Sequence, residues 1–357
     1  MAKDILTLVI NFGSTSTKLA IYKNEEEQEK VNIEHDRAVI NSFEELNDEI
    51  PFRKQVVLDF LKERSMAITD FDVIAPRAGN MAKVNPGTYR VNQLMVDRLR
   101  NRPAARHVCN LCAIVGYELA EPYGIPCFVS DAPSVDQMLP ENKITGIPEI
   151  VKYAGVHGEN MKAVANKTAD KLGKKYEDCD FIICHMGGGI TFSMHRHGEI
   201  IDAYCDDVAS FSPERAGILP SVELIELCFS GKYTEDELKR YMRGRGGVLA
   251  HLGTASMLEV ERRIKDGDEH AKLIYDALLV NIAKSIAGLA TNVDGKVDAI
   301  ILTGGMAHSN YVVSTLERKL QFICPLVVIP GEFEVEHMAL CALKAYRGEI
   351  SAQEYTD

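Results

Sequence analysis

V-I-N-F-G-S-T-S-T-K, residues 9–18, is the stretch that says most about the fold of this 357-residue chain. An apolar strand pattern leads into it, Gly13 allows a tight turn, and an alternating pattern continues to Tyr22. This pattern predicts a β-hairpin with a polar tip. The backbone N–H groups and four hydroxyls of the tip suit a phosphate, although such hydroxyls also satisfy local backbone groups in an ordinary turn.

Two further apolar strands run into glycine turns. Residues 181–184 lead to His185 and a triple glycine, and residues 299–302 lead to T-G-G-M-A-H-S-N. The first of these repeats the hairpin about 175 residues along the chain (187 minus 13), which indicates two similar halves. Three such loops favour a nucleotide site, although the G-x-x-x-x-G-K-[ST] pattern is absent. The predicted phosphate-binding residues are Gly13, Ser14, Thr15, Ser16, Lys18, Gly187, Gly188, Gly189, Gly304, Gly305 and Ser309.

The composition is that of a globular protein with room for two domains, at 46% hydrophobic and 26% charged residues. A net charge of -12 disfavours nucleic-acid binding. We expect no signal peptide and no membrane span, because the apolar runs fall short of about 18 residues. Nine cysteines, an odd number, favour reduced thiols in the cytoplasm. Cys109 and Cys112 are expected to be core residues, not metal ligands.

Short strands alternating with helical patterns predict an α/β fold. Apolar residues at a period near 3.6 predict a helix over residues 271–292, and Thr234 with Glu237 predicts a capping box. The other expected helices cover residues 51–64, 104–120 and 160–172, and the other expected buried strands residues 71–74 and 127–130. No linker stands out, so we place the domain boundary near residue 150.

The segments 11–18, 185–191 and 303–309 together resemble the acetate and butyrate kinase branch of the actin, sugar kinase and Hsp70 superfamily. Further segments bring the chain closer to the butyrate kinases: P-G-T-Y-R-V-N (86–92), F-S-P-E-R-A-G (211–217), E-L-C-F-S-G-K-Y-T (226–234) and K-V-D-A-I-I-L-T-G-G (296–305). The resemblance runs nearly end to end. It implies two ribonuclease-H-like domains with an interdomain cleft for ATP, Mg²⁺ as cofactor, and a homo-oligomer.

This resemblance divides the chain by function. Residues 1–150, with a C-terminal helix over about 338–357, would form the acceptor and phosphoryl domain, and residues 151–337 the nucleotide-binding domain. The implied reaction is reversible transfer of a phosphoryl group from ATP to a short-chain fatty acid such as butanoate. Because this reaction brings two anions within about 3–3.5 Å, positive charge must stabilise the transferring group.

The resemblance assigns that charge to Arg77 and Arg215, whose forked donors match carboxylate and phosphoryl oxygens. The ordinary alternative for Arg77 is a surface ion pair, but it follows the apolar run 71–76. Likewise, His185 would steady the equatorial phosphoryl oxygens and Asn11 would orient the terminal phosphate. Asp131 would lie near the metal and the acceptor, with a helix N-cap as the alternative.

For the magnesium carboxylate the resemblance points to P-G-E-F-E-V-E-H, residues 330–337, and to Asp131 as a second metal residue. Glu334 is the first choice and Glu332 the alternate. His107 matches a histidine near the acyl pocket.

The chain departs from the family pattern on the acceptor side. Phe12 stands where proline is usual, which predicts a less rigid first loop, and residues 202–211 look shorter by about two residues. These departures leave open a branched or shorter acid, such as 2-methylpropanoate, propionate or acetate. They also leave open an ATP-binding regulatory protein without catalysis.

Overall fold

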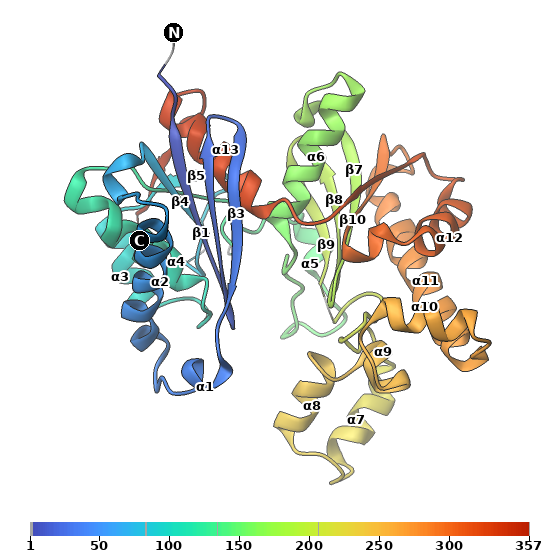
Figure 1. Cartoon of the computed structure of the whole chain (residues 1–357). Coiled ribbons are helices and arrows are strands. Elements are labelled where there is room, and N and C mark those ends of the chain that lie inside the picture. The colour runs from blue at the N-terminus through green and yellow to red at the C-terminus, as the bar shows by residue number, and fades with distance from the viewer. Residues whose placement is uncertain (1–2, 83, 134, 206, 357) are drawn as a thin grey trace. The chain divides into compact units, whose positions relative to one another are not determined.

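The computed structural model describes residues 3–82, 84–133, 135–205 and 207–356, which divide into two compact units (Figure 1). Unit 1 comprises Met1–Asp136 and Phe333–Asp357, and unit 2 comprises Gln137–Glu332. The chain leaves unit 1 before the expected boundary at residue 150. The reason is that Leu139 and Asn142 both donate hydrogen bonds to the Ile201 carbonyl of unit 2, at 2.9 and 3.0 Å.

Two sheets and five helices form the described part of unit 1. The strands are β1 (Leu6–Gly13), β2 (Ser16–Lys23), β3 (Glu26–Glu34), β4 (Val73–Pro76), β5 (Thr88–Arg90), β6 (Phe128–Ser130) and β12 (Gln353–Glu354). The helices are α1 (Arg37–Ile40), α2 (Glu49–Glu63), α3 (Gln93–Asn101), α4 (Asn110–Ala120) and α13 (Glu334–Arg347). The main sheet has the order β3-β2-β1-β4, and the smaller one β12-β5-β6.

Alternation along β1 sends side chains to both faces of the main sheet. Leu8, Ile10 and Phe12 belong to the core cluster that also holds buried residues of α2 and α4. Val9 belongs to a separate cluster with residues of α13. The sheet therefore lies between α2 and α4 on one face and the C-terminal helix on the other.

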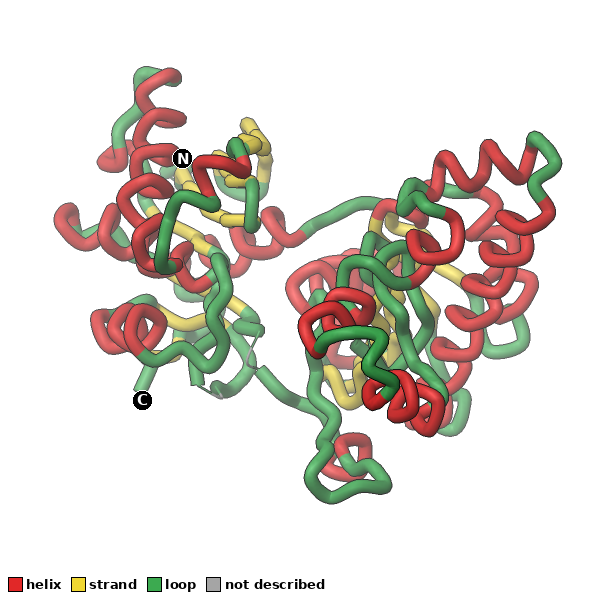
Figure 2. Tube along the Cα trace, turned by 90° about the horizontal axis from the view of Figure 1, so that it is seen from below, coloured by secondary structure: helices red, strands yellow, loops and turns green. Residues whose placement is uncertain are grey.

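Unit 2 is built on one five-stranded sheet, in the order β11-β10-β7-β8-β9. Its strands are β7 (Asp180–Met186), β8 (Ile190–Arg196), β9 (Glu199–Tyr204), β10 (Ala299–Gly304) and β11 (Leu326–Pro330). Its helices are α5 (Pro140–Lys143), α6 (Gly158–Leu172), α7 (Ser221–Phe229), α8 (Glu235–Met242), α9 (Gly247–Leu252), α10 (Met257–Lys265), α11 (Glu269–Leu289) and α12 (Asn310–Leu320). Helices flank the strands in each unit (Figure 2).

The predicted strands and helices are largely confirmed. Both glycine hairpins form, as β1–β2 and β7–β8. Helix α11 covers the helix expected over residues 271–292 as far as Leu289, and a 3-10 helix, Ala290–Val293, follows. The capping box at Thr234 and Glu237 starts α8. Two helix predictions were wrong at their ends. The helix expected from residue 104 begins at Asn110, and the C-terminal helix runs from 334 to 347 and is followed by β12.

One helix corrects the expectation about apolar runs. Residues Glu269–Val293, α11 with the turn after it, are long and apolar enough to cross a membrane by length and composition alone. Much of this helix is buried in the core of unit 2, where Leu278, Ile282 and Ile286 lie within one cluster. This packing indicates that α11 is a core helix of unit 2.

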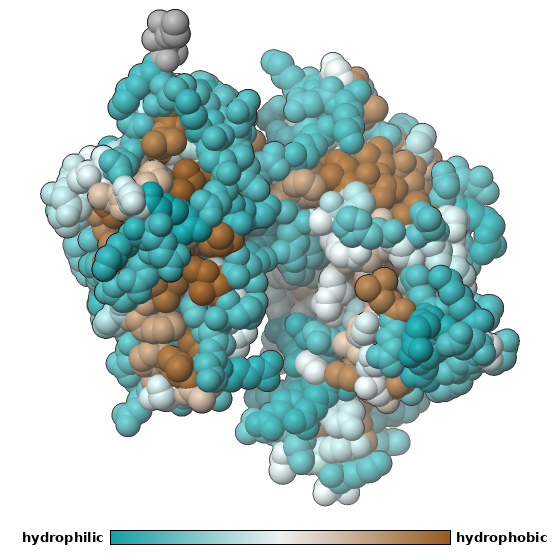
Figure 3. All heavy atoms as spheres, in the orientation of Figure 1, coloured by the Kyte–Doolittle hydropathy of each residue, from teal (hydrophilic) through white to brown (hydrophobic). Residues whose placement is uncertain are grey.

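The nine cysteines all lie in the described residues and none is in a disulfide, and Cys109 and Cys112 are buried beside and within α4, as expected of core residues. The outer surface in view is mostly hydrophilic, with apolar patches on both units (Figure 3).

Candidate active site

Three of the predicted site residues meet at one end of the main sheet of unit 1. Asn11 lies on β1 and Arg77 directly follows β4, and these two strands are parallel neighbours. Arg77 Nη1 lies 3.5 Å from Asn11 Oδ1 and 3.9 Å from Glu334 Oε2. Asn11 Nδ2 donates to the same Glu334 oxygen at 3.4 Å. An amide, a guanidinium and a carboxylate thus share one polar site.

Helix α13 positions Glu334, which is the first residue of that helix. Acidic residues are favourable at this end of a helix. The alternate metal residue, Glu332, belongs to unit 2 and precedes the helix.

Asp131 follows β6 in a left-handed backbone conformation, with φ of 46°. Its Oδ2 lies 2.7 Å from Nε2 of His337 on α13. Burial lowers the pKa of His337, but the neighbouring Cys341 and Asp131 outweigh it and hold this pKa well above its ordinary value. The helix N-cap alternative for Asp131 is wrong, because the next helix in the described chain starts at Pro140.

His107 lies just before α4, and its Nδ1 accepts a hydrogen bond from the Cys109 amide at 3.2 Å. Desolvation and the charge of Arg77 lower the pKa of His107. His107 and Arg77 therefore influence each other electrostatically within unit 1.

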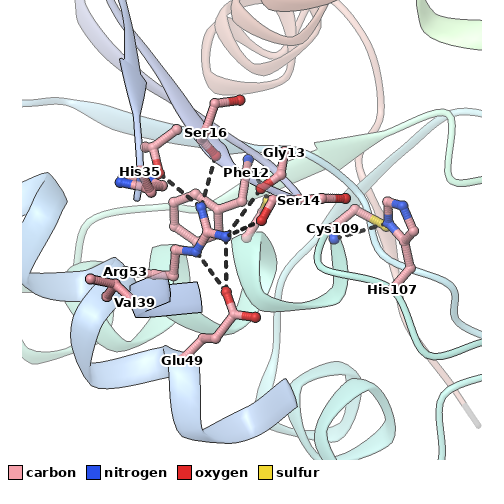
Figure 4. A network of polar contacts seen from close by, with 12 residues as sticks. Phe12, Gly13, Ser14, Ser16, His35, Val39, Glu49, Arg53, His107 and Cys109 are labelled. Atoms are coloured by element: carbon pink, nitrogen blue, oxygen red, sulfur yellow. Dashed lines mark hydrogen bonds and ion pairs between the residues drawn. The ribbon is translucent and has the colours of Figure 1, made fainter. Parts of the chain in front are cut away.

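The first glycine loop is held from inside by Arg53, a residue that the sequence analysis missed (Figure 4). The Arg53 guanidinium is fully buried on α2 and donates to the carbonyls of Ser16, Gly13 and Ser14 at 2.8, 3.1 and 3.2 Å. Its Nε donates to Glu49 at 2.9 Å. In the sequence, Arg53 could have been noticed as a charged residue on the apolar face of the helix predicted over residues 51–64.

Phe12 does not loosen this loop, contrary to the expectation from its place in the sequence. The side chain is fully buried, and its ring centre lies 5.4 Å from the Arg53 guanidinium carbon, within cation–π range. At the outer strand positions Lys18 pairs with Asn11 across the hairpin. The turn that carries Gly13, Ser14, Thr15 and Ser16 is therefore fastened to α2.

In unit 2, His185 lies near the end of β7 and is buried. Nδ2 of Asn160, on α6, lies 2.9 Å from His185 Nδ1. Because an amide nitrogen only donates, Nδ1 accepts and the ring proton sits on Nε2. Burial and the nearby His157 lower the pKa of His185 to about 3. His185 is thus a neutral N–H donor at neutral pH.

His157 is a second residue that the sequence analysis missed. Its ring stacks on His185 with centroids 4.0 Å apart and planes 15° apart. Its Nδ1 lies 2.8 Å from the Thr191 hydroxyl on β8. In the sequence, the available signal was its position three residues before the helix predicted over residues 160–172. His157 and His185 form a histidine pair at the triple-glycine turn. A Cβ on Gly187 would lie 3.5 Å from His185 Nε2.

The triple-glycine turn also receives the segment that carries Arg215. The Ser212 hydroxyl donates to the Gly188 carbonyl at 2.7 Å, and the Arg215 amide donates to the Ser212 hydroxyl at 3.0 Å. A Cβ on Gly188 would lie 2.7 Å from the Glu214 carboxylate. Glycine at 188 therefore leaves room for the Glu214 carboxylate beside the turn.

The third loop uses its two glycines differently. Gly304 has φ of 86°, and a Cβ there would lie 2.5 Å from the Met186 carbonyl oxygen. Gly305 faces open space at the start of a short helix, Gly305–His308. The Ser309 hydroxyl caps α12 and bonds Glu261 at 2.5 Å.

Comparison with known proteins identifies the family. Residues 139–324 match the Acetokinase family. Over 351 residues the chain is 42% identical to a protein described as "Probable butyrate kinase" from Bacteroides thetaiotaomicron, with 98% of this chain and 99% of that protein covered. The chain belongs to the acetokinase family.

Solved structures place this acetokinase chain in the two-domain α/β fold of its family. Acetate kinase from Porphyromonas gingivalis aligns with a TM-score of 0.76 at 18% identity, covering 95% of this chain and 99% of that one. A propionate kinase from Francisella tularensis aligns with a TM-score of 0.73 at 19% identity, covering 94% and 98%. The predicted fold and the predicted family are therefore confirmed.

Proposed function

We propose that this acetokinase transfers the γ-phosphoryl group of ATP to butanoate, giving butanoyl phosphate and ADP, in a reversible reaction. The observation that carries the proposal is the 42% identity, over nearly the whole chain, to a protein described as a probable butyrate kinase. Acetokinase membership already makes the protein a carboxylate kinase by type. The finer assignment concerns which acid is phosphorylated and which residues act.

In unit 1, Arg77 is proposed to bind the acid carboxylate and the transferring phosphoryl group. Its Nη1 lies 3.5 Å from Asn11 Oδ1 and 3.9 Å from Glu334 Oε2, so both residues contact one nitrogen of the guanidinium. A preorganised donor of this kind stabilises the charge that develops in the transition state. Asn11, Lys18 and the first loop would orient the terminal phosphate.

In unit 2, His185 is proposed to donate its Nε2 proton in a hydrogen bond to an equatorial phosphoryl oxygen. The neutral ring makes it a positioning donor that neither gains nor loses a proton in the reaction. Arg215 would supply the second guanidinium. His157, stacked on His185, would keep that ring in place, and the glycines of the second and third loops would bind the nucleotide.

The oxygen donors of unit 1 fit Mg²⁺, which prefers carboxylates, phosphates and water. Glu334 is the residue proposed to hold it, because its carboxylate reaches the Asn11 and Arg77 side chains. Asp131 would be the second residue near the metal, with its Oδ2 bonded to His337. Bound Mg²⁺ would neutralise charge on the phosphates.

The test is an acyl phosphate trap. Purified protein receives Mg-ATP, hydroxylamine and one acid at a time, from acetate to hexanoate with 2-methylpropanoate included. We expect the highest hydroxamate yield with butanoate. A higher yield with acetate or propionate would reassign the substrate, and no hydroxamate with any acid would contradict a carboxylate kinase.

The regulatory alternative loses part of its support, because the buried ring of Phe12 packs under the loop. Nucleotide binding in a calorimeter without turnover would restore it. We further propose a cytoplasmic homo-oligomer. Helix α7 supports association, because its apolar residues Val222, Ile225 and Phe229 are exposed, Phe229 at 87%.

A further inference from the structure

A second group of possible ligands lies beside the proposed magnesium carboxylate and has different chemistry. His337 Nε2 lies 2.7 Å from Asp131 Oδ2 and 3.6 Å from Cys341 Sγ. Their ligand atoms all lie within 4.8 Å of one another. An imidazole, a thiol and a carboxylate therefore converge on one point.

The fold of unit 1 builds this group from two elements. His337 and Cys341 are four residues apart on α13, so both project from the same face of the helix. Asp131 comes from the end of β6, against which α13 packs. The side chains of His337 and Asp131 are each only 10% exposed. The convergence therefore belongs to the packed part of unit 1.

We propose that Asp131, His337 and Cys341 form a binding site for Zn²⁺ or a similar soft divalent ion, which shares Asp131 with the proposed magnesium site and leaves Glu334 outside. Thiolate and imidazole are ligands that Zn²⁺ accepts and Mg²⁺ avoids. Zinc bonds of about 2.0–2.3 Å place tetrahedral ligand atoms about 3.4 Å apart. The sulfur–nitrogen distance of 3.6 Å already fits this value.

Binding requires one small adjustment. The 2.7 Å between His337 and Asp131 is a hydrogen-bond distance, and it opens as the ion takes the place of the proton. That proton and the Cys341 thiol proton pass to solvent, as in other thiolate sites. Three protein ligands leave the fourth zinc position to water.

If the proposed function holds, Zn²⁺ bound at this site affects the kinase reaction. Asp131 is the carboxylate proposed to act near the acceptor, and a bound ion holds it against α13. Zn²⁺ is therefore an inhibitor of the kinase, and release of Zn²⁺ restores the activity.

The first experiment uses Co²⁺ as a coloured substitute for Zn²⁺ on the chelator-treated, full-length protein and needs no turnover. We expect one Co²⁺ per chain, with a thiolate-to-metal band in the near ultraviolet and visible bands of a tetrahedral site, all removed by Zn²⁺. Cys341→Ala is expected to abolish the thiolate band, whereas the exposed Cys228→Ala control retains it. No stoichiometric Co²⁺ binding, or a band that survives in Cys341→Ala, overturns the site.

The second experiment measures acyl phosphate formation with excess Mg-ATP and increasing Zn²⁺. We expect at least tenfold inhibition of the parent, reversed by a zinc-selective chelator. Cys341→Ala should need at least tenfold more Zn²⁺ for half inhibition. A Co²⁺ spectrum without any zinc inhibition overturns the regulatory role. Loss of turnover without added Zn²⁺ on every acid contradicts the proposed function instead, and the Co²⁺ result still decides the site.

Discussion

His185 makes the stability of the protein depend on pH. Its pKa is about 3 in the folded protein and about 6.5 in the unfolded chain, so acid protonates the unfolded chain first. The stabilisation is complete above pH 6.5 and is lost as pH falls from there towards 3. We expect the free energy of unfolding in urea to fall between pH 6.5 and 5.5, and to fall by about 1 kcal/mol less in His185→Asn than in the parent.

The exposed His270, on α11, provides the control for this experiment. The His270→Asn variant should keep the pH dependence of the parent. An unchanged pH dependence in His185→Asn would show that His185 is not held neutral.

Arg215 is the residue at which transition-state stabilisation is tested. Loss of one charge-assisted donor costs about 3–4 kcal/mol, so Arg215→Ala should reduce kcat by roughly 10²–10³. Arg240 is exposed on α8 and serves as the matched arginine, with Arg240→Ala expected at the rate of the parent. A near-parental rate in Arg215→Ala, measured by hydroxamate formation, would remove Arg215 from the site.

At the scale of elements, Arg53 ties α2 to the β1–β2 turn. Arg53→Met leaves Glu49 buried without its cation and frees three loop carbonyls, so we expect a loss of about 3–5 kcal/mol in unfolding free energy. Arg53→Lys keeps the charge but cannot reach all three carbonyls. Arg53→Lys should be more stable than Arg53→Met, yet bind a non-hydrolysable ATP analogue more weakly than the parent, because the first loop is proposed to orient the terminal phosphate.

Arg37, exposed on α1, is the control for both Arg53 variants, and Arg37→Ala should match the parent in unfolding and in binding of the ATP analogue. Parental affinity of Arg53→Lys for the ATP analogue, measured by calorimetry, would limit Arg53 to a role in stability.

The third loop offers a matched pair of glycines. Gly304→Ala combines a left-handed backbone with a Cβ 2.5 Å from a backbone oxygen, so we expect more than about 2 kcal/mol of destabilisation. Gly305→Ala faces open space and should change stability by at most about 0.5 kcal/mol. If Gly305→Ala weakens nucleotide binding at unchanged stability, the glycine at 305 serves the ligand. Equal destabilisation of both variants would contradict this distinction.

At the scale of the whole molecule, each unit has its own core, and the C-terminal segment completes that of unit 1. Ending the chain at Glu332 removes α13, whose Met338 and Ala342 share a cluster with Val9. We expect hydrogen exchange to show lost protection in β1 and β2 and retained protection in β7 and β10. Retained protection in both sheets would show that unit 1 folds without α13.

Features with local causes were predictable. Strand alternation, the glycine turns and the Thr234 capping box each depend on neighbouring residues, and all of them appear in the structure. Helix ends were less predictable, as at Asn110 and Glu334, because packing and capping decide where a helix begins.

The amino-acid sequence is enough to identify a two-domain α/β acetokinase, since its motifs and glycine turns lie in local segments that can be recognised directly. Which residues meet in the site depends on the tertiary structure. The parallel pairing of β1 and β4 puts Asn11 beside Arg77, and the return of α13 brings in Glu334 and His337. The burial of Arg53 and the stacking of His157 on His185 arise in the same way. Such contacts join residues far apart in the chain, so they depend on strand pairing and packing that no single segment specifies.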